Sequence, residues 1–297
     1  MGIFDFFKAK KSKPAQEPAD SAQLGLAELF RRLGILAPQL QSITTDYQEF
    51  SLPKRSGGQR TIHAPNPKLK EIQRTILLRL LARLKSHPNV TGFEKRHSIV
   101  TNAKTHVGAA VILRMDIQGF FPATSANRVL AYFRAIGWDT KTATLLTALC
   151  TYKGSLPQGA PTSPRLSTLV NYEMDARLNG LAKRANAAYT RYADDITFSF
   201  TEDSHENICL TIRMTKKILS EYGYRIHHKK KLHIRRRHQC QQVTGLVVNE
   251  KAALPRRTRR WLRAVKHHLT TGRPASLTPE QLTGWQALEH MIKTQAE

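Results

Sequence analysis

Two carboxylates, Asp194 and Asp195, stand side by side in the segment 189-YTRYADDITFSF-200, between two short runs with the alternating pattern of β-strands. A third carboxylate, Asp116, follows the apolar run 110-AVILRM-115, which is typical of a buried strand. If these strands are neighbours in one sheet, the three acids converge at its edge. Converging carboxylates cannot all stay ionised without a counter-charge, and divalent cations that prefer oxygen ligands, such as Mg²⁺, supply it.

An Asp-Asp pair at a turn is most often only a solvated turn, so the pair alone does not establish a metal site. The chemistry that three such acids would serve is phosphoryl transfer. In that reaction two metal ions, about 3.5–4 Å apart, activate an attacking hydroxyl and neutralise a leaving phosphate. We therefore predict that Asp116, Asp194 and Asp195 are catalytic and hold two Mg²⁺ ions, with the main-chain carbonyl of Ile117 as a further ligand.

The composition points to a polyanionic partner. The chain of 297 residues carries 47 Lys and Arg against 22 Asp and Glu, a formal net charge of +25. So much charge of one sign repels itself and favours a bound polyanion, for which nucleic acid is the first candidate and membrane headgroups are the rival. The sequence has no run of 18 or more apolar residues, no signal-peptide pattern and three widely spaced cysteines. We expect a cytoplasmic protein with reduced thiols and no membrane partner.

The helices and strands that must position the acids can be predicted from the periodicity of apolar residues and from Gly and Pro at turns. Helices are expected at about 22–40, 68–86, 125–136, 139–152, 164–185, 205–222 and 255–269, and a hairpin around Ser56-Gly57-Gly58. Strands are expected at 110–115, at 189–200 as strand, turn and strand, and at 224–235 and 242–248. This alternation around a central hairpin is typical of an α+β fold with a ferredoxin-like, split βαβ sheet and helical additions at both ends.

Three motifs in a fixed order resemble those of the reverse transcriptase family, over about residues 50–250. The box Tyr192-Ala193-Asp194-Asp195 matches the family's Tyr-X-Asp-Asp signature. The segment 113-LRMDIQGFFPAT-124 is similar to the first catalytic motif, in which an aromatic residue follows the Asp by five positions, and 156-LPQGAPTSP-164 is similar to the Pro-Gln-Gly loop. The resemblance implies a right-hand polymerase with a ferredoxin-like palm, helical and β fingers, and a short basic helical thumb.

Two further elements narrow the resemblance to bacterial retron reverse transcriptases. The segment 102-NAKTH-106 matches an Asn-Ala-x-x-His element before the first catalytic Asp, and 243-VTG-245 matches a Val-Thr-Gly element after the palm. The resemblance implies RNA contacts for both elements, through Asn102, His106, Val243, Thr244 and Gly245. For His106, a bridging role inside the fold is the alternative.

The resemblance also implies a nucleotide site. The residues that it assigns there are Lys54, Arg60, Phe121, Gln158, Gly159, Lys230 and Lys231. The Phe121 ring is expected under the sugar of the incoming nucleotide, where it would clash with a 2′-hydroxyl, and Gln158 and Gly159 beside the nascent base pair. The basic residues are expected to contact the triphosphate through charge-assisted hydrogen bonds, and the choice between Lys230 and Lys231 stays open.

A basic helix is expected in 255-PRRTRRWLRAVKHHL-269, and it would bind an RNA or hybrid backbone as a thumb. Its RNA-binding residues are Arg256, Arg257, Arg259, Arg260, Arg263 and Lys266. So many like charges on one face are poorly explained as an ordinary solvated surface. The implied domains are a flexible N-terminal tail (1–21), fingers with N-terminal helices (22–110), the palm (111–250) and the thumb (251–297).

The retron resemblance implies an RNA-directed DNA polymerase that uses deoxynucleoside triphosphates to copy part of a cognate structured non-coding RNA into single-stranded DNA. Priming from an RNA 2′-hydroxyl would give a branched RNA–DNA product, in an anti-phage defence system with a separate effector protein. One alternative is another bacterial reverse transcriptase of the group II intron kind, although such proteins usually continue for longer after the palm. A catalytically idle RNA-binding scaffold is the other, although a scaffold would not need all three acids.

Overall fold

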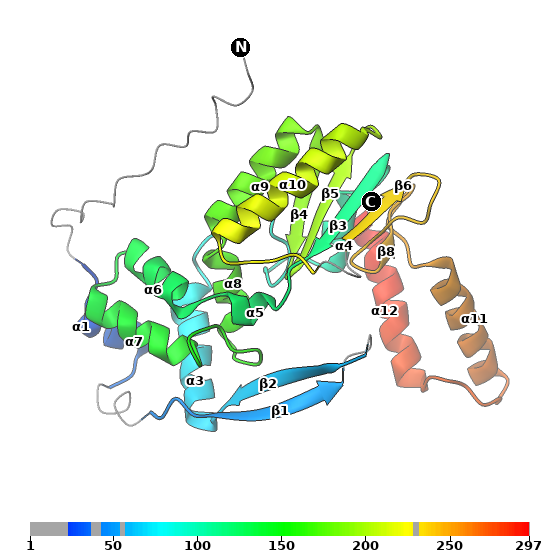
Figure 1. The fold of residues 1–297 in the computed structure, drawn as a ribbon. Helices are drawn as coiled ribbons and strands as arrows, with labels where there is room; N and C mark the ends of the chain where they lie inside the picture. The colour runs from blue at the N-terminus through cyan, green and yellow to red at the C-terminus, as the bar shows by residue number, and fades with distance from the viewer. Residues whose placement is uncertain (1–22, 37–42, 54–56, 228–231, 297) are drawn as a thin grey trace, which may run out of the picture.

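The computed structural model describes residues 23–36, 43–53, 57–227 and 232–296. Its central sheet has four antiparallel strands in the order β4–β5–β3–β6 (Figure 1). The strands are β3 (Val111–Asp116), β4 (Ala187–Tyr192), β5 (Asp195–Phe200) and β6 (Leu232–Arg236). A hairpin joins β4 to β5, and helices connect β3 to β4 and β5 to β6. This is the predicted split βαβ arrangement, which the structure confirms.

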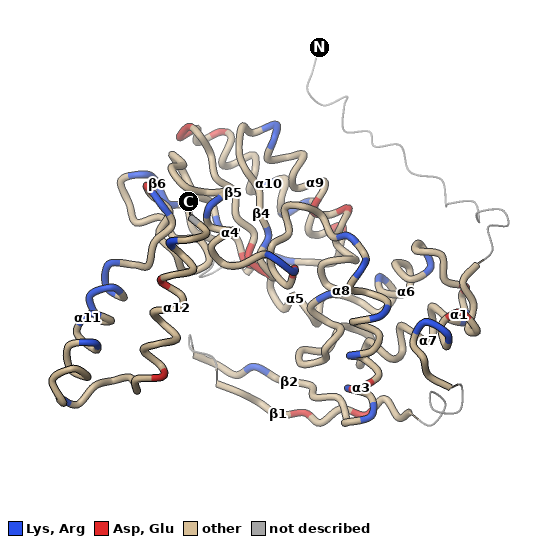
Figure 2. Tube along the Cα trace, turned by 180° about the vertical axis from the view of Figure 1, so that it is seen from behind, with Lys and Arg blue, Asp and Glu red and all other residues tan. Residues whose placement is uncertain are grey.

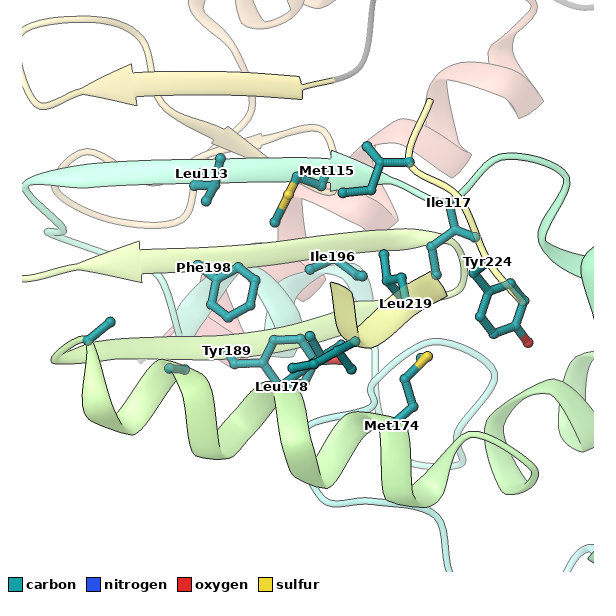
Figure 3. Packing of buried hydrophobic residues seen from close by; sticks show 14 of the residues in the cluster. Leu113, Met115, Ile117, Met174, Leu178, Tyr189, Ile196, Phe198, Leu219 and Tyr224 are labelled. Atoms are coloured by element: carbon teal, nitrogen blue, oxygen red, sulfur yellow. The ribbon is translucent and has the colours of Figure 1, made fainter. Parts of the chain in front are cut away.

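One face of the sheet is covered by α9 (Tyr172–Arg184) and α10 (His205–Glu221), which lie side by side across it (Figure 1). Successive side chains of a strand face opposite sides of a sheet, so alternate residues of β3 point to these helices. Leu113 and Met115 pack there in a buried cluster with Leu178 of α9 (Figure 3). This cluster fixes the strands whose ends carry the acids.

The opposite face has its own buried cluster, which includes Ile112 of β3. The elements that contribute to it are α4 (Ile99–Lys104), the hairpin of β7 (Gln242–Val243) and β8 (Leu246–Val247), and the C-terminal helix pair of α11 (Arg256–Thr270) and α12 (Pro279–Ala296). Strand β3 is therefore buried on both faces, which explains why its sequence is almost continuously apolar.

The Val-Thr-Gly element forms the turn of the β7–β8 hairpin. Thr244 and Gly245 have positive φ angles of 48° and 84°, as tight two-residue hairpin turns require. The Thr244 hydroxyl donates a hydrogen bond to the carbonyl of Ile99 at the start of α4, at 2.8 Å. Val243 is fully buried, so the prediction that its side chain contacts RNA is corrected, whereas Gly245 is exposed.

A third cluster gathers most of the N-terminal half of the chain. Its helices are α1 (Leu26–Leu33), α3 (Pro67–Ile76), the π-helix η2 (Leu77–Leu81), α6 (Ala126–Ala135), α7 (Thr140–Cys150) and α8 (Ser163–Leu169), and the short α5 (Phe120–Ala123) leads into them. The hairpin of β1 (Tyr47–Pro53) and β2 (Gln59–Pro65) lies apart from the central sheet and is exposed along most of its length (Figure 1).

The predicted helix over 164–185 is two helices, α8 and α9, which are separated at Asn171. This side chain is buried and fully engaged: its amide group donates to the Ser167 carbonyl at 2.8 Å and to the Tyr224 hydroxyl at 3.0 Å, and its oxygen accepts from Arg128 at 2.7 Å. The hydrogen bonds to Tyr224 and Arg128 come from distant parts of the chain, so helical periodicity could not reveal the break.

Other boundaries also differ from the predictions. Within the predicted strand over 224–235, the described residues show an isolated bridge of Ile226 to Ile117 and the strand β6 from Leu232, and residues 228–231 lie outside the described residues. The short α4 and the long α12 were not predicted as separate helices. Among the helices described here, none combines the length and the apolar character that a bilayer crossing requires.

The Asn-Ala-x-x-His element lies inside the protein. His106 is fully buried, and its ring nitrogens form hydrogen bonds with the hydroxyls of Ser199 at 2.8 Å and Thr190 at 2.7 Å. Asn102 is also buried and accepts a hydrogen bond from the Thr91 hydroxyl at 2.7 Å. The prediction of direct RNA contact is therefore corrected for both residues, and the structure favours the alternative of a bridge inside the fold.

Burial lowers the pKa of His106 from 6.5 to about 3, so the unfolded chain takes up this proton at a higher pH than the folded protein does. The contribution to stability is complete above pH 6.5 and falls with decreasing pH, by about 1.4 kcal/mol per pH unit. We expect the non-titrating variant His106→Gln to lose less free energy of unfolding than the wild type between about pH 6.5 and 4.5. Urea denaturation at each pH measures this.

The control is His267→Gln, at an exposed position of α11. It should keep the pH dependence of the wild type. Equal pH dependence in His106→Gln and the wild type would contradict the assignment of a buried, neutral imidazole.

Candidate active site

The three acids meet at one edge of the central sheet. In the pairing of β3 with β5, Asp116 lies directly opposite Asp195. Just beyond, the main-chain N–H of Ile117 donates to the carbonyl of Asp194 at 2.9 Å. Asp116 is nearly buried, and Asp194 and Asp195 are half-buried. The convergence expected from the sequence is therefore present, although 78 positions of chain separate Asp116 from Asp194.

The turn that carries Asp194 has an unusual backbone. Ala193 adopts a φ of 56°, in the left-handed region that residues with a β-carbon rarely occupy. A side-chain donor satisfies the carbonyl of Ala193, because one guanidinium nitrogen of Arg191 donates to it at 3.0 Å. The turn is thus held from beneath by a residue of the preceding strand.

Arg191 is fixed by a bidentate ion pair with Asp175 of α9. Its Nε and Nη2 donate to the two carboxylate oxygens at 2.7 and 2.6 Å, and both side chains are closed to solvent. Tyr189 donates its hydroxyl to the same carboxylate at 2.6 Å. Burial alone would lower the pKa of Arg191, but the charge and hydrogen bonds of Asp175 outweigh it and raise the pKa, so the guanidinium stays charged.

A second segment supports the turn from the side. Residues 89–92 run beside the edge strand β4, where Thr91 donates its main-chain N–H to the carbonyl of Arg191 at 3.0 Å. Gly92 then lies against the turn itself: a β-carbon at this position would be 2.3 Å from the nitrogen of Ala193. Only glycine allows this close approach.

The donor set fits a hard divalent cation. It consists of carboxylates and a main-chain carbonyl, the oxygen ligands that Mg²⁺ prefers. In the part of the chain that the structure describes, no three acidic, His or Cys side chains surround a single point, and Asp195 contacts Arg114 at 3.6 Å. Mg²⁺ usually takes one or two carboxylates and completes its shell with water and substrate phosphates, so two of these acids per ion suffice.

Phe121 follows Asp116 by five positions and lies in the short helix α5. It is half-buried, and its ring centroid is 5.6 Å from that of Phe120 and 6.1 Å from that of Phe93. Phe120 itself is buried in the core of the sheet. Phe121 therefore packs against the border of the core, with part of its surface accessible.

The Pro-Gln-Gly loop packs against strand β2. The carbonyl of Gln158 accepts a hydrogen bond from the N–H of His63 at 2.8 Å. Gly159 has a φ of 130°, and a β-carbon there would be 2.7 Å from the carbonyl oxygen of His63. The loop thereby joins the β1–β2 hairpin, with the exposed Arg60, to the body of the protein.

Lys54, Lys230 and Lys231 lie outside the described residues, so their predicted contacts with a triphosphate stay predictions. The basic residues of α11 that are predicted to bind RNA are exposed, and Figure 2 shows Lys and Arg along this helix. They are Arg256, Arg257, Arg259, Arg260, Arg263 and Lys266.

Sequence reasoning missed the residues that hold the catalytic turn in place. Arg191 stands next to the Tyr192–Asp195 box, and its charge inside a strand is a signal that could have marked it. No local signal marks Asp175, which lies in an ordinary amphipathic helix. Gly92 has no signal beyond being a glycine.

A split βαβ sheet that presents carboxylates from two neighbouring strands at one edge is compatible with the palm of a template-directed nucleic acid polymerase. Residues 52–249 match the reverse transcriptase (RNA-dependent DNA polymerase) family. The chain belongs to this family and, within it, to the retron type. Members of the family use divalent metal ions, in agreement with the donor set.

Three curated relatives are retron reverse transcriptases. The Mx162 enzyme of Myxococcus xanthus is 36% identical over 83% of this chain and 58% of its own length. The Ec86 enzyme of Escherichia coli is 36% identical over 86% of this chain and 79% of its own length. The Mx65 enzyme of Myxococcus xanthus is 35% identical over 83% and 61%. The chain thus spans between 58% and 79% of the length of these relatives.

We expect Asp175→Asn to lower the free energy of unfolding by about 3–5 kcal/mol, because it leaves the charge of Arg191 buried without a counter-charge. Chemical denaturation measures the loss. The matched control is Glu221→Gln, which breaks the half-exposed ion pair of Glu221 with Arg177 and should cost less than about 1 kcal/mol. Similar losses of unfolding free energy in the two variants would show that the buried ion pair stabilises the fold no more than the half-exposed one does.

We expect Gly92→Ala to reduce kcat for DNA synthesis on a primed RNA template by on the order of 100-fold, because the new methyl group displaces the catalytic turn. Gly180→Ala is the control, since a β-carbon at that position of α9 meets nothing within 4 Å. This control should keep full activity. Wild-type kcat in Gly92→Ala, with a normal melting temperature, would refute the role of the close approach.

Proposed function

We propose that this protein is an RNA-directed DNA polymerase that copies part of a cognate structured non-coding RNA into single-stranded DNA. The observation that carries the proposal is the meeting of Asp116 and Asp195 across neighbouring strands, with Asp194 at the adjoining turn, in a chain of the reverse transcriptase family. The net charge of +25 fits a protein whose template, primer and product are all polyanions.

In this proposal Asp116, Asp194, Asp195 and the carbonyl of Ile117 would hold two Mg²⁺ ions. When bound, the ions neutralise the phosphates and lower the pKa of the attacking hydroxyl. The hydroxyl oxygen forms a bond to the α-phosphorus of the nucleotide, pyrophosphate leaves, and the hydroxyl proton passes to solvent. The buried ion pair beneath the turn keeps Asp194 at its place during each cycle.

The remaining site residues select and orient the nucleotide. Phe121 excludes a 2′-hydroxyl by the bulk of its accessible ring edge, so that deoxynucleotides are preferred. Gln158 and Gly159 lie beside the nascent base pair, at the junction with β2. The triphosphate is bound by Arg60, with Lys54 and with Lys230 or Lys231 as further phosphate contacts.

The domains of the proposal follow the order of a right-hand polymerase. Residues 22–110 form the fingers, 111–250 the palm and 251–297 the thumb, and the expected tail, 1–21, lies outside the described residues. The thumb binds the backbone of RNA or of the hybrid through the exposed basic residues of α11, where contacts to phosphate require no particular sequence.

The retron relatives support a more specific product. In this view the primer is a 2′-hydroxyl of the cognate RNA, the product is a branched RNA–DNA molecule, and the system acts in anti-phage defence with a separate effector protein. The observations on this chain support the polymerase, and the relatives support the retron product.

The test compares nucleic acid that copurifies with the wild type and with the double variant Asp194→Asn, Asp195→Asn from the native cell. On a denaturing gel, the wild type should yield one discrete DNA that shortens with RNase and survives as a defined single strand. The double variant should yield RNA alone, because the metal ligands are lost while the basic surface is intact.

Two results would contradict the proposal. DNA in equal amount in the double variant would exclude these acids from catalysis. RNA alone in both proteins, together with no extension of a primed RNA template by the wild type, would indicate an RNA-binding scaffold.

A further inference from the structure

We propose that the ring of Phe93 supports the last base pair of the template–primer hybrid, next to the incoming nucleotide. This role is distinct from the sugar selection assigned to Phe121. The inference rests on the proposed polymerase function, and it names a substrate contact that none of the sequence motifs above contains.

Phe93 adjoins two parts of the proposed site. The residue before it, Gly92, abuts the backbone of Tyr192 and Ala193 in the catalytic turn. Its ring centroid is 6.1 Å from that of Phe121. Phe93 therefore lies between the turn that carries Asp194 and the ring expected under the sugar of the incoming nucleotide.

The backbone of Phe93 is strained. Its φ is 65°, a value that a bulky L-residue rarely adopts and that costs about 1–3 kcal/mol. Such a conformation persists only where the surroundings impose it. The structure shows what imposes it here, because the chain is tied down on both sides of the ring.

On the N-terminal side, Thr91 bonds through its main chain to Arg191, at 3.0 Å, and through its hydroxyl to Asn102, at 2.7 Å. On the C-terminal side, Glu94 forms an ion pair with Arg165, whose Nε also donates to the carbonyl of Leu81 in the π-helix at 3.3 Å. The ring is consequently held at a defined place, although it is itself poorly packed.

The Phe93 side chain remains 43% exposed. A single exposed phenylalanine would need no explanation. This one is held in a strained backbone next to Gly92, which abuts the turn, and a large part of its surface stays accessible to a substrate. A flat apolar ring at this place offers a surface on which any base can stack, worth about 1–3 kcal/mol per base in single-stranded sites.

The place of Phe93 in the site indicates which part of the substrate its ring would contact. The incoming nucleotide lies over Phe121 in the proposed site, and the base pair that precedes it stacks on the nucleotide toward the attacking hydroxyl and the catalytic turn. Phe93 adjoins both the turn and Phe121, so the terminal base pair is the part of the substrate within its reach. A contact of this kind holds the primer end without reading its sequence.

The test uses the full-length protein and an RNA template annealed to a DNA primer. We expect Phe93→Ala to raise the Kd for this hybrid roughly 10-fold without nucleotide, measured by fluorescence anisotropy, and to shorten the products of a single binding event. Phe93→Tyr should keep wild-type affinity, and Phe93→Leu should lie between the two. None of the three should change the preference for deoxynucleotides, whereas Phe121→Ala should increase ribonucleotide incorporation.

The matched control is Leu210→Ala, which removes a similarly exposed apolar side chain, 37% exposed, from the outer helix α10. It should leave both Kd and product length unchanged. Melting temperatures separate unfolding from loss of contact, and Phe93→Leu provides the test if Phe93→Ala is unstable.

Unchanged Kd and product length in Phe93→Ala, with the wild type active, would overturn this inference and leave the proposed function standing. A change of sugar preference in Phe93→Ala would also overturn it, because Phe93 would then belong to the sugar pocket. Failure of the wild type to extend any primed template would overturn the proposed function and this inference with it.

Discussion

The guanidinium of Arg191 and the carboxylate of Asp175 form a bidentate ion pair that is closed to solvent. Arg191 directly precedes the Tyr192–Asp195 box. Taking two charges out of water costs several kcal/mol each, which is recovered only when the geometry is good and the remaining hydrogen bonds are made. Both additional hydrogen bonds are present here: the Tyr189 hydroxyl donates to Asp175, and Arg191 donates to the carbonyl of Ala193. Apolar residues of similar size could give equal stability, but they could not hold the carbonyl of a left-handed alanine. The pair therefore serves the orientation of the turn at Ala193, which Asp194 follows directly.

The two elements that mark the retron type meet on the other side of the sheet. The helix with Asn102 begins at Ile99, whose carbonyl accepts the hydroxyl of Thr244 from the Val-Thr-Gly turn. His106 continues the connection to β4 and β5 through two hydroxyls. These residues thus join the C-terminal hairpin to the central sheet, and the C-terminal helix pair packs on the same cluster. Both elements thus have a structural role in this chain, because they connect segments that are far apart in the sequence.

The three acids of the site and the basic residues of α11 lie on different parts of the fold. The few acids at the sheet edge lie in a chain with a large excess of Lys and Arg, many of which are exposed on α11 (Figure 2). A strongly positive surface attracts nucleic acid over several ångströms, beyond the range of contacts, and this attraction weakens as salt increases. The acids would then act on a substrate that the basic surface already holds. In the proposed function, nucleic acid binding and phosphoryl transfer lie on different elements, so that the loss of one need not abolish the other.

The sequence by itself determined the class of fold, most of the helices and the three acids, because these depend on local periodicity and on motifs of a few residues. The split βαβ order followed from the alternation of elements, and the convergence of Asp116 with Asp194 and Asp195 at one edge followed if the strands were neighbours, whereas the register that pairs Asp116 with Asp195 came from the structure. Only the tertiary structure decided what lies beneath and beside the catalytic turn: Asp175 from a distant helix, and Gly92 and Phe93 from a loop far along the chain. It also decided that Asn102 and His106 are buried, since a polar side chain has the same appearance in a sequence whether its partner is water, RNA or a buried hydroxyl. Hydrogen bonds and close contacts between segments far apart in the chain leave no periodic trace, and they set the geometry of this site.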